Sequence, residues 1–151
     1  MKTKILFPII TSSIVATMAI YFFLDTSYEK SIRAKYHYEI GEYREAYSLA
    51  KEAFGLDVYN RMASTIMAQS TTSLKYVKYI EMGKSYMVDI NEIATHEYIT
   101  DQDKAKIRIV CEIMMESYVK LAPSVITDKE LIEKSTQYYN RFKELYEKVT
   151  K

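Results

Sequence analysis

The chain of 151 residues contains only three glycines and two prolines, and it has no tryptophan. β-Sandwiches and β-barrels need frequent tight turns, in which glycine and proline predominate. The shortage of both residues therefore argues against a sheet protein. The chain also has a single cysteine, Cys111, and one thiol cannot form an internal disulfide scaffold. Because Cys111 lies on an apolar helical stripe, we interpret it as a small buried hydrophobic residue.

An excess of charge of either sign is also absent. The chain carries 21 basic and 20 acidic residues, a formal net charge of +1. The five arginines are scattered along the sequence and form no cluster. A surface that binds nucleic acid needs a basic patch or a strong basic excess. The sequence therefore predicts no nucleic-acid partner.

The sequence lacks the motifs of metal and catalytic sites. It has two histidines, His37 and His96, without a second ligand type at metal-binding spacing. It contains no His-Glu-x-x-His, no calcium loop, no Gly-rich phosphate loop and no Gly-x-Ser-x-Gly elbow. We therefore expect no catalytic residue, no metal and no cofactor, and we expect that the protein is not an enzyme. The alternative, a small helical enzyme or ligand-binding domain, requires a pocket with convergent polar groups.

One long apolar run is present, at the N-terminus. Residues 5–24 are twenty consecutive uncharged residues between Lys4 and Asp25. As a helix they would span about 30 Å, the thickness of the hydrocarbon core of a bilayer. The run predicts a first domain, residues 1–25, that is a cytoplasmic tip and transmembrane signal anchor contacting the lipid bilayer through residues 5–24. The alternative is a cleaved signal peptide, although Ala16 and Ala19 are three residues apart rather than two.

The charges beside this run predict its orientation. Lys2 and Lys4 precede it and Asp25 follows it. Because cytoplasmic flanks carry the positive charge, we expect the N-terminus in the cytoplasm and residues 26–151 in the periplasm of a bacterium. The expected location is the inner, cytoplasmic membrane, with a single pass. Basic residues soon after the run, among them Lys30 and Arg33, weaken this bias.

The rest of the chain has a helical pattern. Apolar residues recur at spacings of three and four, and no run alternates as a half-buried strand does. The spacing predicts helices over residues 27–40, 43–54, 59–73 and 74–98. Gly55 is the expected left-handed residue that ends the second of these. The predicted fold class is all-α, an N-terminal transmembrane helix followed by five or six helices in antiparallel hairpins.

Two further helices have capping signals. The first follows Thr100 and Asp101 and is ended by Pro123. The second follows Thr127, which with Glu130 matches a capping box and predicts Thr127 as the N-cap. The helices from residue 26 onward are expected to form one domain, residues 26–151.

The stretch from Gly41 to Asp57 reads GEYREAYSLAKEAFGLD. It resembles the second half of a tetratricopeptide repeat, which is a pair of antiparallel helices. The matching positions are the turn glycine, an aromatic residue and three small residues: Gly41, Tyr43, Ala46, Ala50 and Ala53. Glycine permits the tight reversal, and the alanines let the helices approach closely. The resemblance implies stacked helix pairs whose curved surface binds other proteins.

The chain departs from the tetratricopeptide pattern in places. Val58 stands where the family has proline after Leu-Asp, and the first helix has Lys30 and Arg33 at positions where the family prefers large apolar residues. An alanine-rich helical hairpin outside the family is the alternative.

Two helix faces are candidate protein-binding surfaces. The exposed face of the first helix after the anchor is expected to present Tyr28, Ser31, Lys35 and Tyr38. Alternatively, its tyrosines cover the core or lie near lipid headgroups. The last helix has a wide apolar stripe that includes Tyr138, Phe142 and Leu145. Such a stripe must pack either on its own bundle or on a second protein.

These observations together predict a membrane-anchored scaffold or adaptor in a bacterial envelope assembly. Its partners are expected to be other envelope proteins or copies of itself. Its architecture is similar to that of accessory subunits of secretion systems and flagellar motors. The alternative is a transient assembly factor or chaperone for an inner-membrane complex. A permanent subunit would bury the last-helix stripe against a neighbour, whereas a transient factor would cover it with its own bundle.

Overall fold

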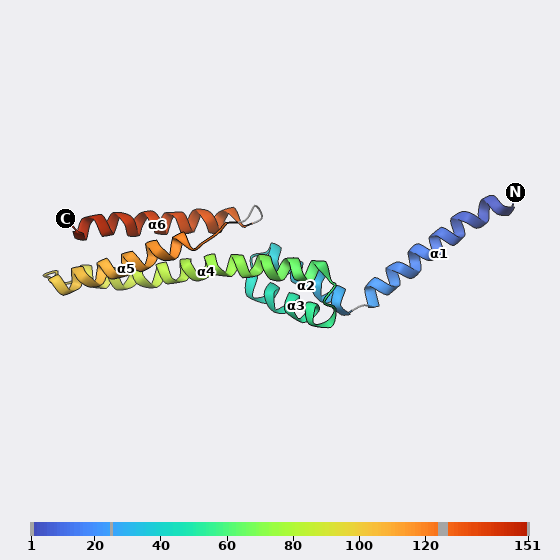
Figure 1. The fold of residues 1–151 in the computed structure, drawn as a ribbon, viewed down its shortest axis with the longest axis horizontal. Helices are drawn as coiled ribbons and strands as arrows, with labels where there is room; N and C mark the ends of the chain where they lie inside the picture. Colours follow the sequence, from blue (N-terminus) through green and yellow to red (C-terminus); the bar gives the residue numbers. More distant parts are fainter. Residues whose placement is uncertain (1, 25, 124–126, 151) are drawn as a thin grey trace. The chain divides into compact units, whose positions relative to one another are not determined.

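The computed structural model describes residues 2–24, 26–123 and 127–150. These residues form six α-helices and no strand, which confirms the prediction of an all-α fold (Figure 1). The helices are α1 (Lys2–Leu24), α2 (Thr26–Glu39), α3 (Tyr43–Leu56), α4 (Arg61–Ala94), α5 (Asp101–Val119) and α6 (Lys129–Thr150). The chain divides into two compact units, Met1–Ser70 and Thr71–Lys151, and α4 continues from the first into the second.

Helix α1 contains the apolar run. The hydroxyl of Thr11 donates to the carbonyl oxygen of Pro8, and that of Thr17 donates to the carbonyl oxygen of Ser13. Its large apolar side chains between Ile9 and Ile20 are exposed. Among the residues that the structure describes, no helix combines the length and the apolarity needed to cross a membrane. The transmembrane part of the predicted architecture is therefore not supported, and the predicted domain boundary falls on Asp25, which lies outside the described residues.

In the first unit, α2 and α3 form a hairpin that also packs against the first turns of α4. The core of this unit consists of small and aliphatic residues: Ala34, Ala46, Leu49, Ala50 and Ile66. All three alanines of this core have no exposed surface, so the helix backbones approach each other closely. The prediction that small residues line this hairpin is confirmed.

The turn between α2 and α3 is built on Gly41, whose φ of 84° is in the left-handed region. The Gly41 N–H donates to the carbonyl oxygen of Tyr38 (3.1 Å), and the Glu42 N–H donates to that of His37 (2.9 Å). This pair of bonds is a Schellman motif, which satisfies the last carbonyls of α2. The predicted turn at Gly41 is confirmed.

The prediction for Gly55 is wrong. Gly55 lies inside α3, which ends at Leu56, and Gly41 is the only glycine with positive φ in the described part of the chain. The chain leaves α3 through Asp57, which has extended backbone angles (φ −142°, ψ 107°). A carboxylate oxygen of Asp57 accepts a hydrogen bond from the Tyr59 N–H (2.9 Å). This Asx turn reverses the chain without a left-handed residue.

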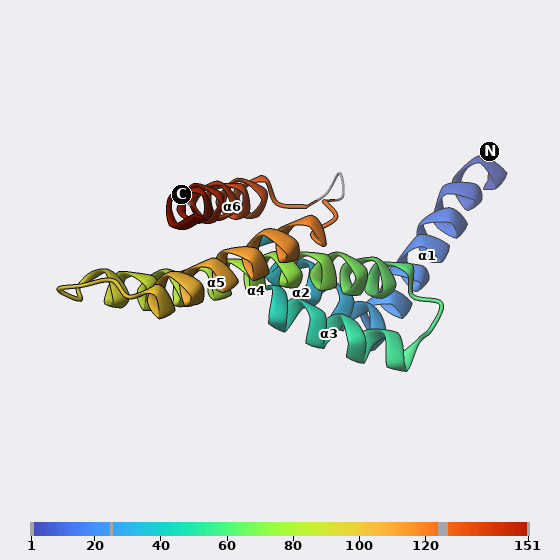
Figure 2. The same cartoon turned by 60° about the vertical axis from the view of Figure 1, so that its left-hand side comes forward.

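The second unit is a three-helix bundle made of α4 from Thr71 onward, α5 and α6. Figures 1 and 2 both show α5 running back along α4, with α6 beside α5. The core is a cluster of fully or almost fully buried side chains: Tyr79, Ile90, Ile107, Cys111, Met114 and Phe142. Leu145, Tyr146 and Val149 of α6 pack against this cluster.

The helix boundaries differ from the predicted ones in the middle of α4 and at the starts of α5 and α6. The break predicted between residues 73 and 74 is wrong, because α4 is one helix of 34 residues and neither Gly nor Pro lies in it before Gly83. The helix predicted after Thr100 and Asp101 is confirmed, but it begins earlier, at Asp101, with Thr100 as the N-cap of a capping box that Asp103 completes. The capping box predicted at Thr127 is out of register by one residue. Helix α6 begins at Lys129, so Asp128 precedes it, and the Asp128 carboxylate accepts from the Glu130 N–H (2.8 Å).

Candidate protein-binding surfaces

The four residues predicted for the exposed face of α2 do not share one environment. Lys35 is exposed, Tyr28 and Tyr38 are half-buried, and Ser31 has no exposed surface. Tyr38 packs against the alanine core, and its ring meets that of Tyr43 edge-on at 5.4 Å. The expectation that Ser31 lies on an exposed face is wrong, and Tyr38 covers the core, as the alternative interpretation of the tyrosines proposed.

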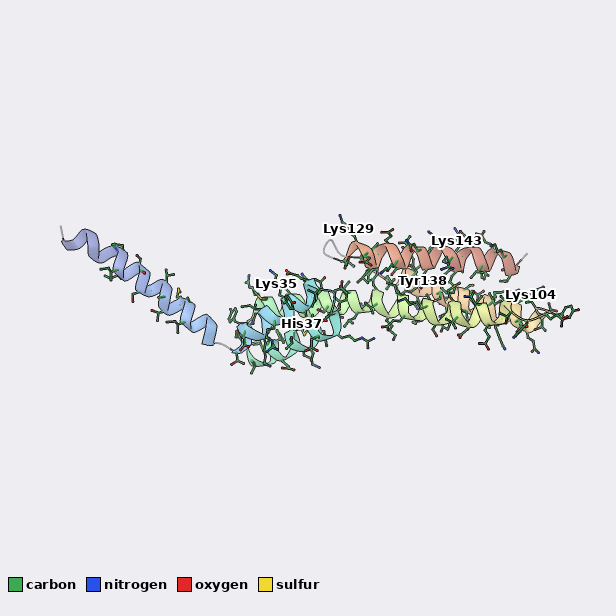
Figure 3. All side chains as sticks on the ribbon, turned by 180° about the vertical axis from the view of Figure 1, so that it is seen from behind. Lys35, His37, Lys104, Lys129, Tyr138 and Lys143 are labelled. Carbon is green, nitrogen blue, oxygen red and sulfur yellow. The ribbon has the colours of Figure 1, made fainter. Side chains whose placement is uncertain are left out.

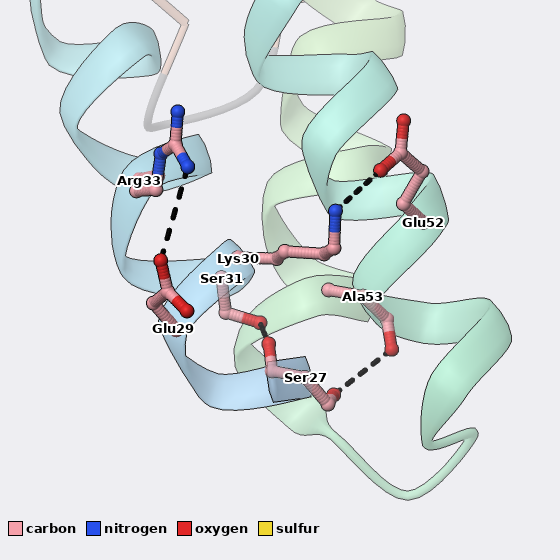
Figure 4. A network of polar contacts seen from close by, with 7 residues as sticks. All are labelled: Ser27, Glu29, Lys30, Ser31, Arg33, Glu52 and Ala53. Carbon is pink, nitrogen blue, oxygen red and sulfur yellow. Dashed lines mark hydrogen bonds and ion pairs between the residues drawn. The ribbon is translucent and has the colours of Figure 1, made fainter. Parts of the chain in front are cut away.

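Ser31 belongs to a buried polar network that joins α2, α3 and α4. Its hydroxyl donates to the Ser27 carbonyl oxygen (2.9 Å), and the Ser27 hydroxyl donates to the Ala53 carbonyl oxygen of α3 (2.9 Å) (Figure 4). The side-chain amide of Asn60 donates to both serine hydroxyls, each at 2.8 Å. Helical periodicity could not reveal this network, because it places polar residues such as serine and asparagine on the outside of a helix pair.

Asn60 has a second role at the start of α4. Its side-chain oxygen accepts a hydrogen bond from the Ala63 N–H (3.1 Å), so it is the N-cap of α4. One fully buried side chain therefore caps one helix and binds another. Lys30 of α2 also forms an ion pair with Glu52 of α3, with 2.7 Å between the Lys30 Nζ and the Glu52 carboxylate (Figure 4). This bond lowers the pKa of Glu52. The serine hydroxyl bond to the α3 backbone and the Lys30–Glu52 ion pair join the two helices of the hairpin.

The three residues predicted on α6 mostly face their own bundle. Phe142 has no exposed surface and lies in the core, and the half-buried Leu145 packs against the same core. Tyr138 is half-buried, and its ring stacks on that of Phe142 at 6.4 Å. Phe142 is therefore not available to a partner, and the prediction that it lies on a binding surface is wrong. Tyr138 differs, because it borders an open hollow.

That hollow lies between α4 and α6 in the second unit and has a volume of about 400 Å³. We call it the α4–α6 groove. Its lining from α4 is Val77, Ile80, Glu81 and Lys84, and its lining from α6 is Leu131, Lys134, Gln137, Tyr138 and Arg141. Ile80 is buried, and Val77, Leu131 and Tyr138 are half-buried. The remaining five lining residues are exposed, so the groove has an apolar floor and a polar rim.

A glycine outside the predicted functional residues shapes this groove. Gly83 of α4 is buried, and a Cβ built on it would lie 2.8 Å from Cδ1 of Tyr138. Figure 3 shows Tyr138 on the side of α6 that faces the other two helices and Lys143 on the outer side. The available signal was a glycine inside a helical pattern with no turn, which often has a packing reason.

The rim of the groove is predominantly basic. Its charged residues are Lys84, Lys134 and Arg141 against one carboxylate, that of Glu81. Lys134 is bonded to Glu130, one turn earlier in α6, and this bond raises the pKa of Lys134. Lys84 and Arg141 take part in no ion pair with any residue that the structure describes. Within the described part of the chain, therefore, no carboxylate forms an ion pair with either of these two charges.

A cluster of tyrosines lies elsewhere in the bundle. The rings of Tyr118 and Tyr139 stack at 4.5 Å, and the Tyr118 hydroxyl is 3.0 Å from the Thr136 hydroxyl. They border a second hollow of about 340 Å³, together with Tyr76 and Leu121. Burial raises the pKa of Tyr79 beyond its ordinary value of 10.0 and raises that of Cys111 to about 11. Both groups therefore remain protonated at neutral pH.

Over residues 2–24, 26–123 and 127–150, no group of three or more His, Cys, Asp and Glu side chains could hold a metal ion. No protein-family model, no curated protein sequence and no solved structure matches the chain. The function is therefore inferred from the residues and geometry of the chain itself.

Proposed function

We propose that this protein is a non-enzymatic scaffold or adaptor that binds other proteins in a bacterial envelope assembly. The observation that carries the proposal is the α4–α6 groove, which is open, has an apolar floor and is bordered by exposed polar residues. Recessed apolar surface with a polar rim is the usual composition of a protein-binding site. The α2–α3 hairpin, with its turn glycine and buried alanines, adds a tetratricopeptide-like element to the same chain.

The proposal includes attachment to the inner membrane through residues 5–24. These residues carry no charge, and the large apolar side chains of α1 from Ile9 to Ile20 are exposed. Apolar surface of this extent needs a cover, and the hydrocarbon core of a bilayer would supply it. A reporter that is active only in the periplasm, fused after Lys151, is expected to be active. A silent reporter would contradict the proposed orientation.

A second candidate function, a transient assembly factor, is favoured by one observation. The apolar stripe of α6 is covered by its own bundle, since Phe142, Leu145 and Val149 pack against Tyr79, Cys111 and Met114. A protein whose apolar helix face is buried within its own bundle can be stable as a monomer between binding events. The two candidates differ in stoichiometry: a permanent subunit co-purifies with its partner at a fixed ratio, whereas a transient factor is mostly recovered alone.

Site-specific photo-crosslinking in native membranes tests protein binding at the groove. A photoreactive amino acid at Val77, on the groove floor, is expected to capture a specific protein. The same amino acid at Lys143, on the outer side of α6, is the matched control and is expected to capture much less of it. Equal capture at the two positions, or none at Val77, would refute the groove as the binding site.

A further inference from the structure

The walls of the α4–α6 groove are long enough to contact two to three turns of a helix. Its α4 wall consists of Val77, Ile80, Glu81 and Lys84, which are spaced as one face of a helix. This wall is about 10 Å long, and the α6 wall from Leu131 to Arg141 is about 15 Å long, at 1.5 Å per residue. A groove of this length holds two to three turns of a third helix. Docking of an amphipathic helix in a groove between two helices is a common mode of peptide recognition.

The floor of the groove is apolar. Ile80 is 6% exposed, and Val77, Leu131 and Tyr138 are half-buried around it. A bound helix with apolar residues at positions i, i+3 or i+4, and i+7 would place them over this floor. The contact of Tyr138 with Gly83 holds one side of the floor in place.

The rim of the groove carries more positive than negative charge. Lys84 and Arg141 lie on opposite walls, one on α4 and one on α6, and neither is engaged in an ion pair within the described ranges. Lys134 adds a third cation, although Glu130 is bonded to it. Glu81 is the one acidic residue of the lining. Acidic residues on a ligand that flank its apolar face would therefore meet complementary charge on both walls.

We propose that the α4–α6 groove binds an amphipathic helix of a partner protein, with apolar side chains on the floor and Asp or Glu side chains paired with Lys84 and Arg141. This inference rests on the proposed protein-binding function and names the chemistry of the partner. A membrane surface fits less well, because lipid headgroups would engage the basic rim but leave the recessed floor around Ile80 unused. The apolar stripe of α6 from a second copy is not a suitable occupant, since it is covered by its own bundle.

Synthetic peptides test the charge preference on the full-length chain in detergent micelles. The probe is an amphipathic helical peptide with leucines at the spacing above and glutamates beside them. One matched peptide has glutamine in place of each glutamate, and another has lysine. Fluorescence anisotropy is expected to show the glutamate peptide binding about tenfold more tightly than the glutamine peptide, with an affinity that falls as salt is added.

A pair of variants on one helix locates the interaction. Arg141→Glu and Lys143→Glu make the same change of charge two residues apart, but only Arg141 lines the groove. Arg141→Glu is expected to weaken the glutamate peptide about tenfold or more, and Lys143→Glu to leave it within about twofold. Lys84→Glu is expected to weaken binding of the glutamate peptide to a similar extent, because Lys84 lines the opposite wall of the groove. Thermal melting followed by circular dichroism establishes that each variant is folded.

The outcomes separate this inference from the proposed function. If the glutamate and glutamine peptides bound equally, or the lysine peptide bound best, the proposed acidic character of the partner would be wrong. If Arg141→Glu still weakened peptide binding in that case, the groove would remain a protein-binding site. Equal effects of Arg141→Glu and Lys143→Glu would overturn the groove as the site. Binding of anionic vesicles in an Arg141-dependent way, with no binding of any peptide, would assign the groove to lipid and contradict both proposals.

Discussion

Tyr138 of α6 packs its ring directly against the backbone of Gly83 on α4, so closely that a Cβ on the glycine would lie 2.8 Å from Cδ1 and 3.0 Å from Cγ of the ring. Neither atom is the far end of a flexible side chain, so the ring cannot yield without rotating away from Phe142, on which it stacks. The absence of a side chain at Gly83 therefore sets how closely α4 and α6 approach, and with it one wall of the α4–α6 groove.

Gly83→Ala is expected to destabilise the protein by about 1 kcal/mol. Alanine is favoured over glycine inside a helix by about 1 kcal/mol, but overpacking against Tyr138 costs about 1–3 kcal/mol. Urea unfolding measures the difference. Gly55→Ala is the matched control, because Gly55 is also helical and a Cβ there meets nothing within 4 Å. The control is expected to be stabilising by up to about 1 kcal/mol.

A double-mutant cycle identifies the cause of the Gly83→Ala effect. In a Tyr138→Ala background the ring is gone, so Gly83→Ala is expected to become neutral or stabilising. If Gly83→Ala destabilised both backgrounds equally, contact with Tyr138 would not be the reason for the glycine.

Gly41→Val is expected to lower the free energy of unfolding by about 1–2 kcal/mol. Gly41 has a φ of 84° and open space around its Cα, so the cost is backbone strain and not a clash. Asparagine tolerates the left-handed region, so Gly41→Asn is the control and is expected to lose clearly less stability. Thermal melting compares the three proteins, and a valine variant that melts like the wild type would contradict the turn geometry.

Local signals in the sequence predicted much of this fold correctly. Gly41 marked the first turn, Thr100 marked the start of α5, and the alanines of α3 marked a close helix pair, because each depends on a residue and its immediate neighbours. The prediction that Gly55 ends α3 is wrong, because the sequence does not reveal that Asp57 makes an Asx turn one residue beyond the helix. The break predicted at residue 73 is wrong because α4 continues through this position, where neither Gly nor Pro interrupts it.

The candidate site was less predictable than the fold. Ser31 and Phe142 were placed on binding faces, yet both are completely buried. The periodicity of apolar residues indicates that a helix face is buried, but it does not indicate what buries it. In this chain Asn60 contacts Ser31 and Met114 lies in the same core as Phe142, so both residues are buried within their own chain. The α4–α6 groove depends on the distance between two helices about fifty residues apart in sequence, and that distance depends on Gly83 and Tyr138. Nothing local to either residue indicates the other.

Asn60→Ala is expected to cost about 2–3 kcal/mol of stability. The substitution removes the N-cap bond to the Ala63 N–H and both bonds to the hydroxyls of Ser27 and Ser31, in a site without exposed surface. Ser64→Ala is the control, because Ser64 lies on the exposed side of the same first turn of α4, and its effect is expected to be within about 0.5 kcal/mol. Similar losses in the two variants, measured by urea unfolding, would refute the role assigned to the network.

The capping box of α5 predicts a dependence of stability on pH. The Thr100 hydroxyl and backbone N–H both donate to the Asp103 carboxylate, at 2.7 and 3.0 Å, and they hold its pKa below the ordinary value of 3.8, with smaller contributions from His96 and Lys106. Because the folded state binds this proton less readily than the unfolded state, the contribution is present above pH 3.8 and is lost as the pH falls through the lowered pKa.

Asp103→Asn is therefore expected to unfold at a lower urea concentration than the wild type at neutral pH, and the gap should close as the pH is lowered below 3.8. Asp101→Asn is the matched control, because Asp101 occupies the same first turn of α5 but is fully exposed and accepts no bond from Thr100. The control is expected to show a smaller gap at neutral pH, since a solvated carboxylate near a helix N-terminus contributes little. A gap for Asp103→Asn that stayed constant across the acidic range would mean that the carboxylate charge is not what stabilises the cap.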